Sequence, residues 1–465
     1  MYGEPQTPLH VTAFSQQPLS FVAPEVTSEL GSIHAIHLLE NGPKGPRVHW
    51  QTTQLNLLLS FARSRSRYWQ QRLPNTPLTL EALAGIEPLT RQALAAQVAA
   101  EGALVQAEDG QEVKGYASSG STGTPIRVHY LAQNGRYNEL RSLAQYLIEN
   151  RNLNHNRTFI KPANATQLRD SGQNMQVETV ATWLGQLSGF FQGGHHKIIQ
   201  IVRPDEALIE ALRAHPVGYL ACLGSQMDWL VDQLGDSIVD LGIHMWLHHS
   251  DNLNPRTRER LAGLGIPSQS IYSCSEVGLI AFECATQAGH YHVAHSNVIV
   301  EASDERVDCE GVTLNKLLVT HLHSYATPII RYELGDYGRV QQTCPCGHEG
   351  TTLSNVYGRK KFFIQTAAGA VFFPFFSAPL QSVLDFQEIS MRQVRLGAVE
   401  VDIVSAEQLA SEDLALAARY LQSVTSAQIE FALRQVDAID WSKNPKRLPF
   451  VCYLADSISS SQPSA

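Results

Sequence analysis

A ten-residue stretch, Tyr116–Pro125, reads YASSGSTGTP and sets hydroxyl side chains around two glycines three positions apart. Glycines leave the backbone N–H groups free to converge on an anion, and Ser and Thr hydroxyls add further donors. No lysine follows the second glycine, so the stretch is not a Walker A loop. On its own it fits a phosphate-binding loop and a flexible turn equally well. The phosphate-binding interpretation names Ser118, Ser119, Gly120, Ser121, Thr122, Gly123 and Thr124.

Two carboxylates follow segments whose composition is typical of strands. Glu276 stands in YSCSEVG, residues 272–278, where it can reach a Mg²⁺ ion held on phosphates while Ser275 donates to a phosphate oxygen. Taken singly, this segment is better explained by an ordinary strand-to-loop turn. Asp336 follows a glycine turn in RYELGD and can accept hydrogen bonds from both hydroxyls of a ribose. Arg359, in the later segment VYGRKK, can meet the same nucleotide.

Local signals place YSCSEVG at the end of a strand. Asn254 has the chemistry of a helix N-cap, Pro255 suits the first helical position, and Gly263 closes the helix. Residues 266–272 then form a short strand, and SCSEVG follows at its carboxyl end. In open α/β sheets that end is where ligands bind.

The flanking regions predict a chain of two domains. Residues 1–50 are rich in Pro, Gly and Thr, and we expect them to run over the surface, whereas the apolar residues from Leu55 to Trp69 follow a helical period. Near the C-terminus, residues 399–403 and 429–433 alternate as half-buried strands around a helix over residues 411–424. Such a β-α-β module is large enough for a small separate domain.

The composition narrows the class of protein. A chain of 465 residues is too long for one compact core and predicts about two or three domains. Its formal net charge of −9 disfavours nucleic acid as a partner, since phosphates require a basic face. The first twenty residues lack a secretory pattern, and no long apolar run predicts a membrane span. Seven scattered cysteines are not a disulfide framework, so we expect a cytoplasmic enzyme with small-molecule substrates.

The order and spacing of the four segments resemble the adenylate-forming superfamily of acyl-CoA synthetases, adenylation domains and luciferases. SSGSTGTP matches its phosphate loop, YSCSEVG its Y-G-x-T-E segment, RYELGDYGR its Y-R-T-G-D segment, and GRKK stands at its G-R-x-D-D hinge. The resemblance covers roughly residues 50–450. It implies an α/β fold with a large multi-layer domain of mixed sheets and helices, residues 1–357. A small mobile α/β lid, residues 358–465, follows it.

Within the superfamily, the chain looks most like the phenylacetate–CoA ligase family. The shared features are S-E-V-G, an E-C…H-V stretch and a C-P-C-G shortly before the hinge. Cys344 and Cys346 can ligate one metal ion through thiolates, and with Cys284 and a histidine they would make the Cys₃His shell of structural zinc. His292 matches the histidine of the family pattern, but His290 lies on the same strand face and stays an alternative.

The resemblance also implies a catalytic lysine near the C-terminus, in DWSKNPKRLPF. Lys446 is preferred because KRLPFV is closer to the family's run, and Lys443 is the alternative. The chain departs from the family in lacking the glycine before this lysine. It also has Lys360 and Lys361 in place of the hinge carboxylates, and Glu333 in place of an arginine.

The implied reaction is ATP-dependent activation of a carboxylic acid, aromatic by resemblance, to an acyl-adenylate with release of pyrophosphate. In it Tyr272, Ser273 and Asp336 contact the nucleoside, Glu276 holds Mg²⁺, and coenzyme A accepts the acyl group. One alternative acceptor is a carrier-protein thiol or an amine. A further alternative is a nucleotide-binding protein without turnover. Relatives in the superfamily are often dimers, which makes a homodimer an expectation.

Overall fold

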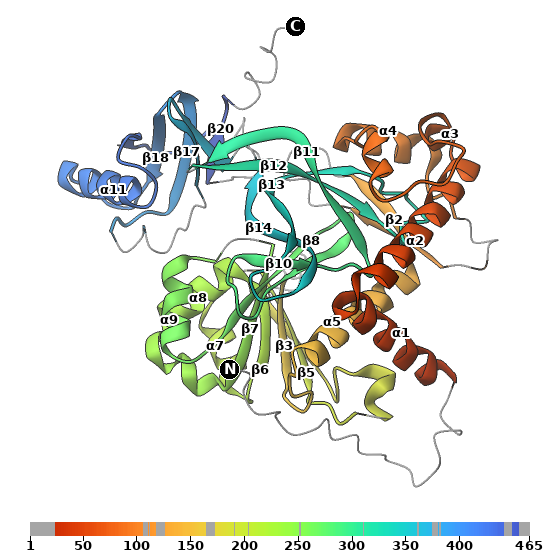
Figure 1. Ribbon diagram of the computed structural model, residues 1–465. Helices are drawn as coiled ribbons and strands as arrows, with labels where there is room; N and C mark the ends of the chain where they lie inside the picture. The colour runs from red at the N-terminus through yellow and green to blue at the C-terminus, as the bar shows by residue number, and fades with distance from the viewer. Residues whose placement is uncertain are drawn as a thin grey trace, which may run out of the picture.

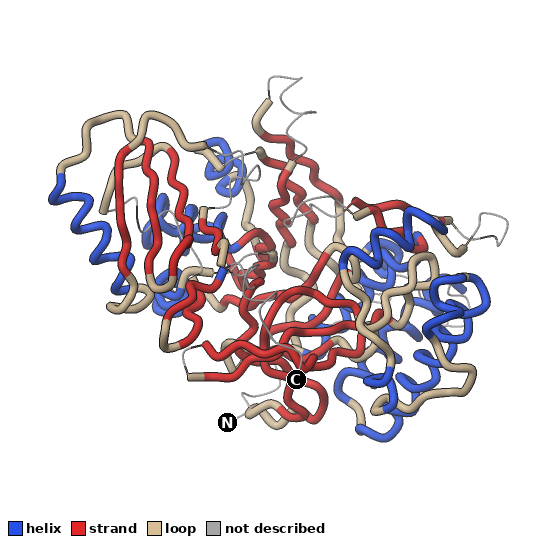
Figure 2. Tube along the Cα trace, turned by 90° about the horizontal axis from the view of Figure 1, so that it is seen from above, coloured by secondary structure: helices blue, strands red, loops and turns tan. Residues whose placement is uncertain are grey.

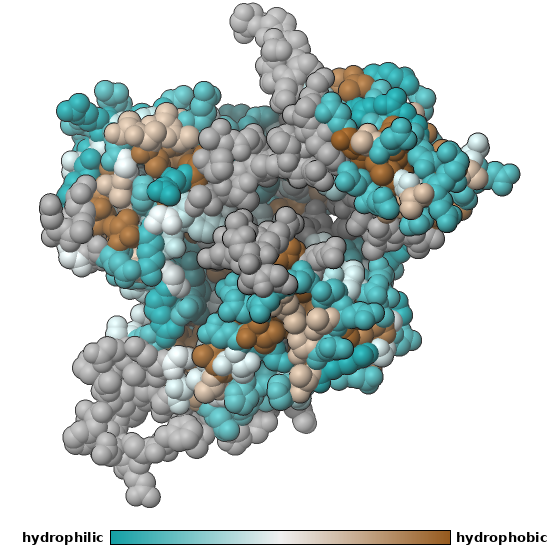
Figure 3. Space-filling model, turned by 180° about the vertical axis from the view of Figure 1, so that it is seen from behind, coloured by the Kyte–Doolittle hydropathy of each residue, from teal (hydrophilic) through white to brown (hydrophobic). Residues whose placement is uncertain are grey.

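The computed structural model describes residues 24–105, 110, 112–117, 126–163, 173–189, 191–202, 204–250, 253–309, 311–359, 362–373, 380, 383–440 and 449–454. These residues form a large α/β part and a smaller α/β part near the C-terminus, as predicted (Figure 1). No helix in the described part of the chain is long and apolar enough to cross a membrane. On the face seen in Figure 3, hydrophobic residues lie in separate patches among hydrophilic ones.

A 14-stranded sheet runs through the large part in the order β15-β16-β11-β12-β13-β14-β10-β9-β8-β7-β6-β3-β5-β4. One half contains a parallel run of β5, β3, β6, β7 and β8. The strands of this half, with antiparallel β4 at the edge, are β3 (Arg157–Pro162), β4 (Met175–Val180), β5 (His196–Ile201), β6 (Gly218–Leu223), β7 (Ile243–His249) and β8 (Ser268–Cys274).

Helices cover both faces of the parallel half, and the central strand β6, GYLACL, is accordingly buried on both faces. In β6, Leu220 and Cys222 enter the core beneath α7 (Glu206–Arg213), α8 (Gly224–Leu234), η5 (Gly235–Leu241) and α9 (Pro255–Gly263). The alternate residue Tyr219 enters the core shared with α1 (Pro24–Asn41), α5 (Ala132–Ile148) and η4 (Gly185–Gly189). Figure 1 shows the two groups of helices on opposite sides of β6 and β7. The predicted α9 is confirmed, with the Asn254 side chain capping the N–H of Arg256.

The other half of the sheet is mainly antiparallel. Its strands are β9 (Gly278–Glu283), β10 (His290–Val293), β11 (Val298–Cys309), β12 (Val312–His321), β13 (Tyr332–Thr343), β14 (Glu349–Arg359), β15 (Phe363–Thr366) and β16 (Gly369–Phe372). Against them pack α2 (Lys44–Arg65), α3 (Arg67–Arg72), η2 (Ala82–Gly85) and α4 (Arg91–Glu101). The apolar stripe predicted from Leu55 to Trp69 is confirmed as buried.

The prediction that residues 1–50 run over the surface is wrong for residues 24–41 and 44–50, because α1 is a packed helix and α2 begins at Lys44. Its Glu40 accepts hydrogen bonds from the backbone N–H groups of His295 and Ser296, both at 2.9 Å. Burial opposes ionisation of Glu40, but the bonds from His295 and Ser296 outweigh it and hold its pKa below the ordinary value. The helix is therefore fastened to the loop before β11 by a charged group.

The small part is built as the C-terminal pattern predicts. Its sheet has the order β19-β18-β17-β20, with β17 (Glu388–Arg395), β18 (Ala398–Val404), β19 (Glu430–Gln435) and β20 (Phe450–Cys452). Helix α11 (Ser411–Ser423) buries Ala417 and Leu421 against this sheet. Figure 2 shows the helix along one face of the strands from above. The predicted boundary at residue 357 falls inside β14, and Ile364 beyond it already packs into the core of the small part.

Candidate nucleotide site and a cysteine–histidine cluster

The hairpin of β8 and β9 carries the segment YSCSEVG at the end of the parallel half of the sheet. Gly278 pairs with Cys274 and has φ +80, and a Cβ atom there would lie 3.0 Å from Nδ2 of Asn138. Both the backbone conformation and the close approach of Asn138 require glycine at this turn. The tight turn holds Glu276 beside the sheet end, with exposed Ser275 and half-buried Ser273 on the same hairpin.

Tyr272, Asp336 and Arg359 come together although they lie far apart in the sequence. The Tyr272 hydroxyl donates to Oδ2 of Asp336 at 2.8 Å, and Asp336 pairs across β13 and β14 with Arg359. Burial is the main influence on the pKa of Asp336 and raises it, while the charge of Arg359 and the hydrogen bond from Tyr272 act in the opposite direction. Burial, and then the Asp336 carboxylate, raise the pKa of Tyr272 well above its ordinary value.

Glu276 has two partners that the sequence did not suggest. Nη1 of Arg91 lies 2.7 Å from Oε1 of Glu276, and the Tyr332 hydroxyl donates to the same oxygen at 3.3 Å. The Glu276 side chain is only 6% exposed. Arg91 lies in the segment IEPLTRQALAAQ, residues 86–97, and no local spacing connects it with Glu276.

Several predicted site residues fall outside the described part of the chain. They are the phosphate-loop residues 118–124, the hinge residues Lys360 and Lys361, and the alternative catalytic residues Lys443 and Lys446. The strands on either side of the loop are described. β1 (Val113–Ala117) and β2 (Arg127–Leu131) pair antiparallel in a separate two-stranded sheet, so the loop joins the two strands of a hairpin.

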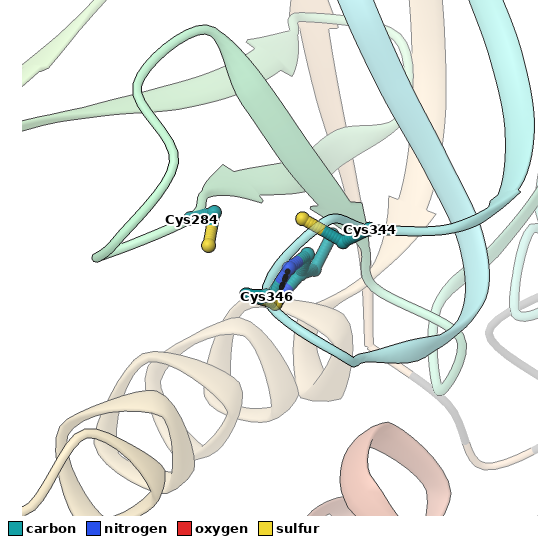
Figure 4. A group of neighbouring side chains, drawn as sticks. Cys284, Cys344 and Cys346 are labelled. Atoms are coloured by element: carbon teal, nitrogen blue, oxygen red, sulfur yellow. Dashed lines mark hydrogen bonds between the residues drawn. The ribbon is translucent and has the colours of Figure 1, made fainter. Parts of the chain in front are cut away.

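A second group of side chains lies where β9, β10 and the turn between β13 and β14 meet. One ligand atom from each of Cys284, His292, Cys344 and Cys346 lies within 4.8 Å of all the others. Figure 4 shows the sulfur atoms of Cys284 and Cys344 directed into the space beside Cys346. Nε2 of His292 is 3.4 Å from Sγ of Cys346. The alternative ligand His290 is not part of this group.

The turn at residues 344–348 has the backbone geometry that suits a metal-binding knuckle. The N–H of Gly347 donates to the Cys344 carbonyl at 2.9 Å, and the N–H of Cys344 donates to the His348 carbonyl at 3.0 Å. The N–H of His348 lies 3.4 Å from Sγ of Cys346, where it can stabilise a thiolate. Three cysteines and one histidine at this separation fit tetrahedral Zn²⁺, for which this donor set is common in structural sites.

Glu283 fixes the loop that presents Cys284. Its buried carboxylate accepts from the backbone N–H of Ser270 and of Gly289, each at 2.7 Å, and from Nη2 of Arg258 at 3.1 Å. Three donors on one carboxylate make a rigid support outside the sulfur and nitrogen ligands, as is typical around metal sites.

No protein-family model matches the sequence, and no curated protein matches it. Solved structures do match. A 2-hydroxyisobutyryl-CoA ligase in the postadenylation state with 2-HIB-AMP has a TM-score of 0.64 at 11% identity, covering 91% of this chain and 93% of that chain. The same ligase with R3-HIB-AMP gives 0.63 at 12% identity over 91% and 93% of the chains. With 2-HIB-AMP and CoA in its thioesterification state it gives 0.55 at 13% identity, again over 91% and 93%.

Proposed function

We propose that this chain, which has the fold of an adenylate-forming acyl-CoA ligase, uses ATP to convert a carboxylic acid to its acyl-adenylate and then to a CoA thioester. The observation that carries the proposal is that Tyr272, Asp336 and Arg359 lie together, with the Tyr272 hydroxyl 2.8 Å from Oδ2 of Asp336. Glu276 is on the same β8–β9 hairpin as Tyr272. These residues come from separate strands and were expected to share one nucleotide. The proposal is supported by the position of Tyr272 near the carboxyl end of β8, since ligands bind at that end of the strands in open α/β sheets.

The chemistry asks mainly for positioning and cancellation of charge. The carboxylate of the acid attacks the α-phosphate in line, the bond to the bridging oxygen breaks, and pyrophosphate leaves. Asp336 accepts from the ribose hydroxyls, and the ring of Tyr272 borders the base. Residues 118–124 donate to the β- and γ-phosphates, and Lys446 stabilises the charge on the transferring phosphoryl group. Mg²⁺, when bound, offsets the phosphate charge, and Glu276 is the residue that would hold it.

The second half of the reaction passes the acyl group to a thiol. We assign the role of hinge to residues 358–361, which begin at the end of β14. A swing of that part would withdraw Lys446 and admit the thiol of coenzyme A. The 2-hydroxyisobutyryl-CoA ligase structures were solved with an acyl-adenylate and with CoA. We propose an aromatic acid as the substrate, because the sequence resembles phenylacetate–CoA ligases.

We also propose that the cluster of Cys284, His292, Cys344 and Cys346 holds a structural Zn²⁺ ion. These four side chains would supply all the ligands of a tetrahedral ion, which would leave no open position for a substrate. The ion would join three separate pieces of chain, and its role is to stabilise the fold.

A second candidate function is nucleotide binding without turnover. It is favoured by the lysines at positions 360 and 361, where the family has carboxylates, and by the missing glycine before the C-terminal lysine. An adenylating enzyme with a different acceptor, a carrier-protein thiol or an amine, is distinguished by AMP production that does not require free CoA.

The deciding experiment is pyrophosphate exchange with MgATP, without CoA, over a panel of aromatic, aliphatic and amino acids. Exchange with one acid establishes adenylation and names the substrate class. Adding CoA should then give steady AMP production with that acid. ATP binding without exchange across the whole panel would favour the non-catalytic candidate.

A further inference from the structure

The ion pair between Arg91 and Glu276 stands at the carboxylate to which we assign Mg²⁺. The two side chains are 2.7 Å apart, and they are 23% and 6% exposed. The Tyr332 hydroxyl lies 3.3 Å from the same carboxylate oxygen and is itself in a buried residue. Glu276 therefore has a cation and a hydroxyl donor on Oε1.

The position of Arg91 is built into the fold. It is the first residue of α4, and the Thr90 side chain caps that helix by accepting from the N–H of Ala93. Leu89, two residues before Arg91, makes two backbone hydrogen bonds at the start of β13. Its N–H donates to the carbonyl of Arg331, just before the strand, at 2.9 Å, and its carbonyl accepts from the N–H of Glu333 at 3.0 Å. A surface ion pair between flexible side chains would lack this support.

Arg331 secures the same segment from the other side. Its guanidinium donates to the carbonyls of Ala84 and Ile86 and forms an ion pair with Glu301, 3.1 Å away. The chain from residue 84 to residue 91 is thus fastened to β13 at several points, and α4 starts in a fixed place. These contacts hold Arg91 next to Glu276.

A guanidinium and a divalent metal ion compete for one carboxylate oxygen. Mg²⁺ requires direct contact with an oxygen ligand in nearly ideal octahedral geometry. Arg91 holds that oxygen with a charge-assisted hydrogen bond, which is among the stronger kinds. A metal ion that arrives alone must displace Arg91 and gains only one carboxylate. A metal ion that arrives on a nucleotide brings phosphate oxygens, which guanidinium groups bind well.

We propose that Arg91 excludes divalent metal from Glu276 until nucleotide binds, so that metal enters this site only with its nucleotide. The proposal rests on the assignment of Glu276 as the metal-holding residue of the proposed function. It makes Arg91 a positioning residue, since it acts through Glu276.

The test measures metal binding by the full-length protein without nucleotide, using Mn²⁺ and electron paramagnetic resonance. We expect Arg91→Gln to bind Mn²⁺ at about a tenfold lower concentration than the wild type, as the loss of one charge-assisted hydrogen bond implies. Adding Glu276→Gln to that variant should abolish the gain. Arg91→Lys, which keeps the positive charge, should stay near the wild type. The control Arg260→Gln removes an ion pair of similar length, 3.0 Å to Asp236, away from the site.

Equal Mn²⁺ binding by Arg91→Gln and the wild type, with both folded by circular dichroism, would overturn the proposal. So would a gain that survives Glu276→Gln. The readout needs no turnover, which separates it from the proposed function. Tighter Mn²⁺ binding that depends on Glu276, in a protein that exchanges no pyrophosphate, would support this inference while removing the assigned reaction.

Discussion

The hydroxyl of Tyr272 should set the acidic limit of nucleotide binding. Its hydrogen bond to Asp336, 2.8 Å long, is one of two interactions that favour the ionised carboxylate, the other being the charge of Arg359. Burial acts against them and is the larger influence, so the pKa of Asp336 is raised overall. Tyr272→Phe keeps the ring and removes only the hydroxyl. The pKa of Asp336 must then rise further.

The size of the shift follows from the strength of that bond. A hydrogen bond to a charged group contributes about 1.5–3 kcal/mol, and one pKa unit corresponds to about 1.4 kcal/mol. Asp336 should therefore titrate about one to two pH units higher in Tyr272→Phe. The carboxylate is the form that accepts from ribose, so ATP binding is lost as the pH falls through this pKa. The acidic limb of the binding profile should move upward by the same amount.

The assay is ATP affinity by calorimetry between about pH 5 and pH 9, where a single ionisation appears as one limb. Tyr291→Phe is the matched control, since its buried ring lies 6.4 Å from that of Tyr272, centroid to centroid, and its hydroxyl interacts with Ser270. Asp336→Asn should bind ATP weakly at every pH. If the limb of Tyr272→Phe coincides with that of the wild type, or moves to lower pH, Asp336 is not the group that limits binding.

Three further outcomes are expected. Purified protein should contain about one zinc per chain by mass spectrometry. Cys346→Ser should lose the metal and melt at a lower temperature, whereas Cys309→Ser, in a separate core cluster, should keep the metal. Lys446→Ala should abolish pyrophosphate exchange and spare thioester formation from supplied adenylate. The control Lys443→Ala should exchange pyrophosphate normally, and normal exchange by Lys446→Ala would contradict the assignment. Burial, and then the charge of a nearby arginine, lowers the pKa of His323 to about 4, so the unfolded chain takes up the proton first as the pH falls. His323 should contribute about 2 kcal/mol to the stability that urea unfolding shows to be lost between pH 7 and pH 5. The loss should be smaller by this amount in His323→Gln, and an equal loss in the variant and the wild type would exclude this contribution.

The parts of the fold that could be predicted are those whose signals are local. Asn254, Pro255 and Gly263 mark the ends of one helix within ten positions, and α9 begins and ends as they indicate. The alternation around residues 399–403 likewise requires no knowledge of the rest of the chain to predict β18. The same locality explains the error at α1, whose apolar residues follow no clear helical stripe.

The candidate site could be predicted only in part, because its contacts cross the sequence. The motif residues Tyr272 and Asp336 carry recognisable neighbours, so their meeting was expected. Arg91 and Glu276 are separated by 185 positions, and no motif around Arg91 predicts that the two residues form an ion pair. The sequence also could not show whether His290 or His292 joins the cysteines, because both lie on one face of β10 and the cysteines come from other parts of the chain. The turn at residues 344–348 lies beside His292 and decides between them.

Strand β14 connects the cysteine–histidine cluster with the proposed nucleotide site. It is 11 residues long, beginning at Glu349, just past the turn at residues 344–348, and ending at Arg359, opposite Asp336. At about 3.4 Å per residue it spans roughly 34 Å. The group of Cys284, His292, Cys344 and Cys346 brings the turn before β14 against β9 and β10, so it helps to fix where the strand begins. Oxidation of those thiols would loosen the start of β14, and we expect the displacement to reach its other end, at the proposed nucleotide site.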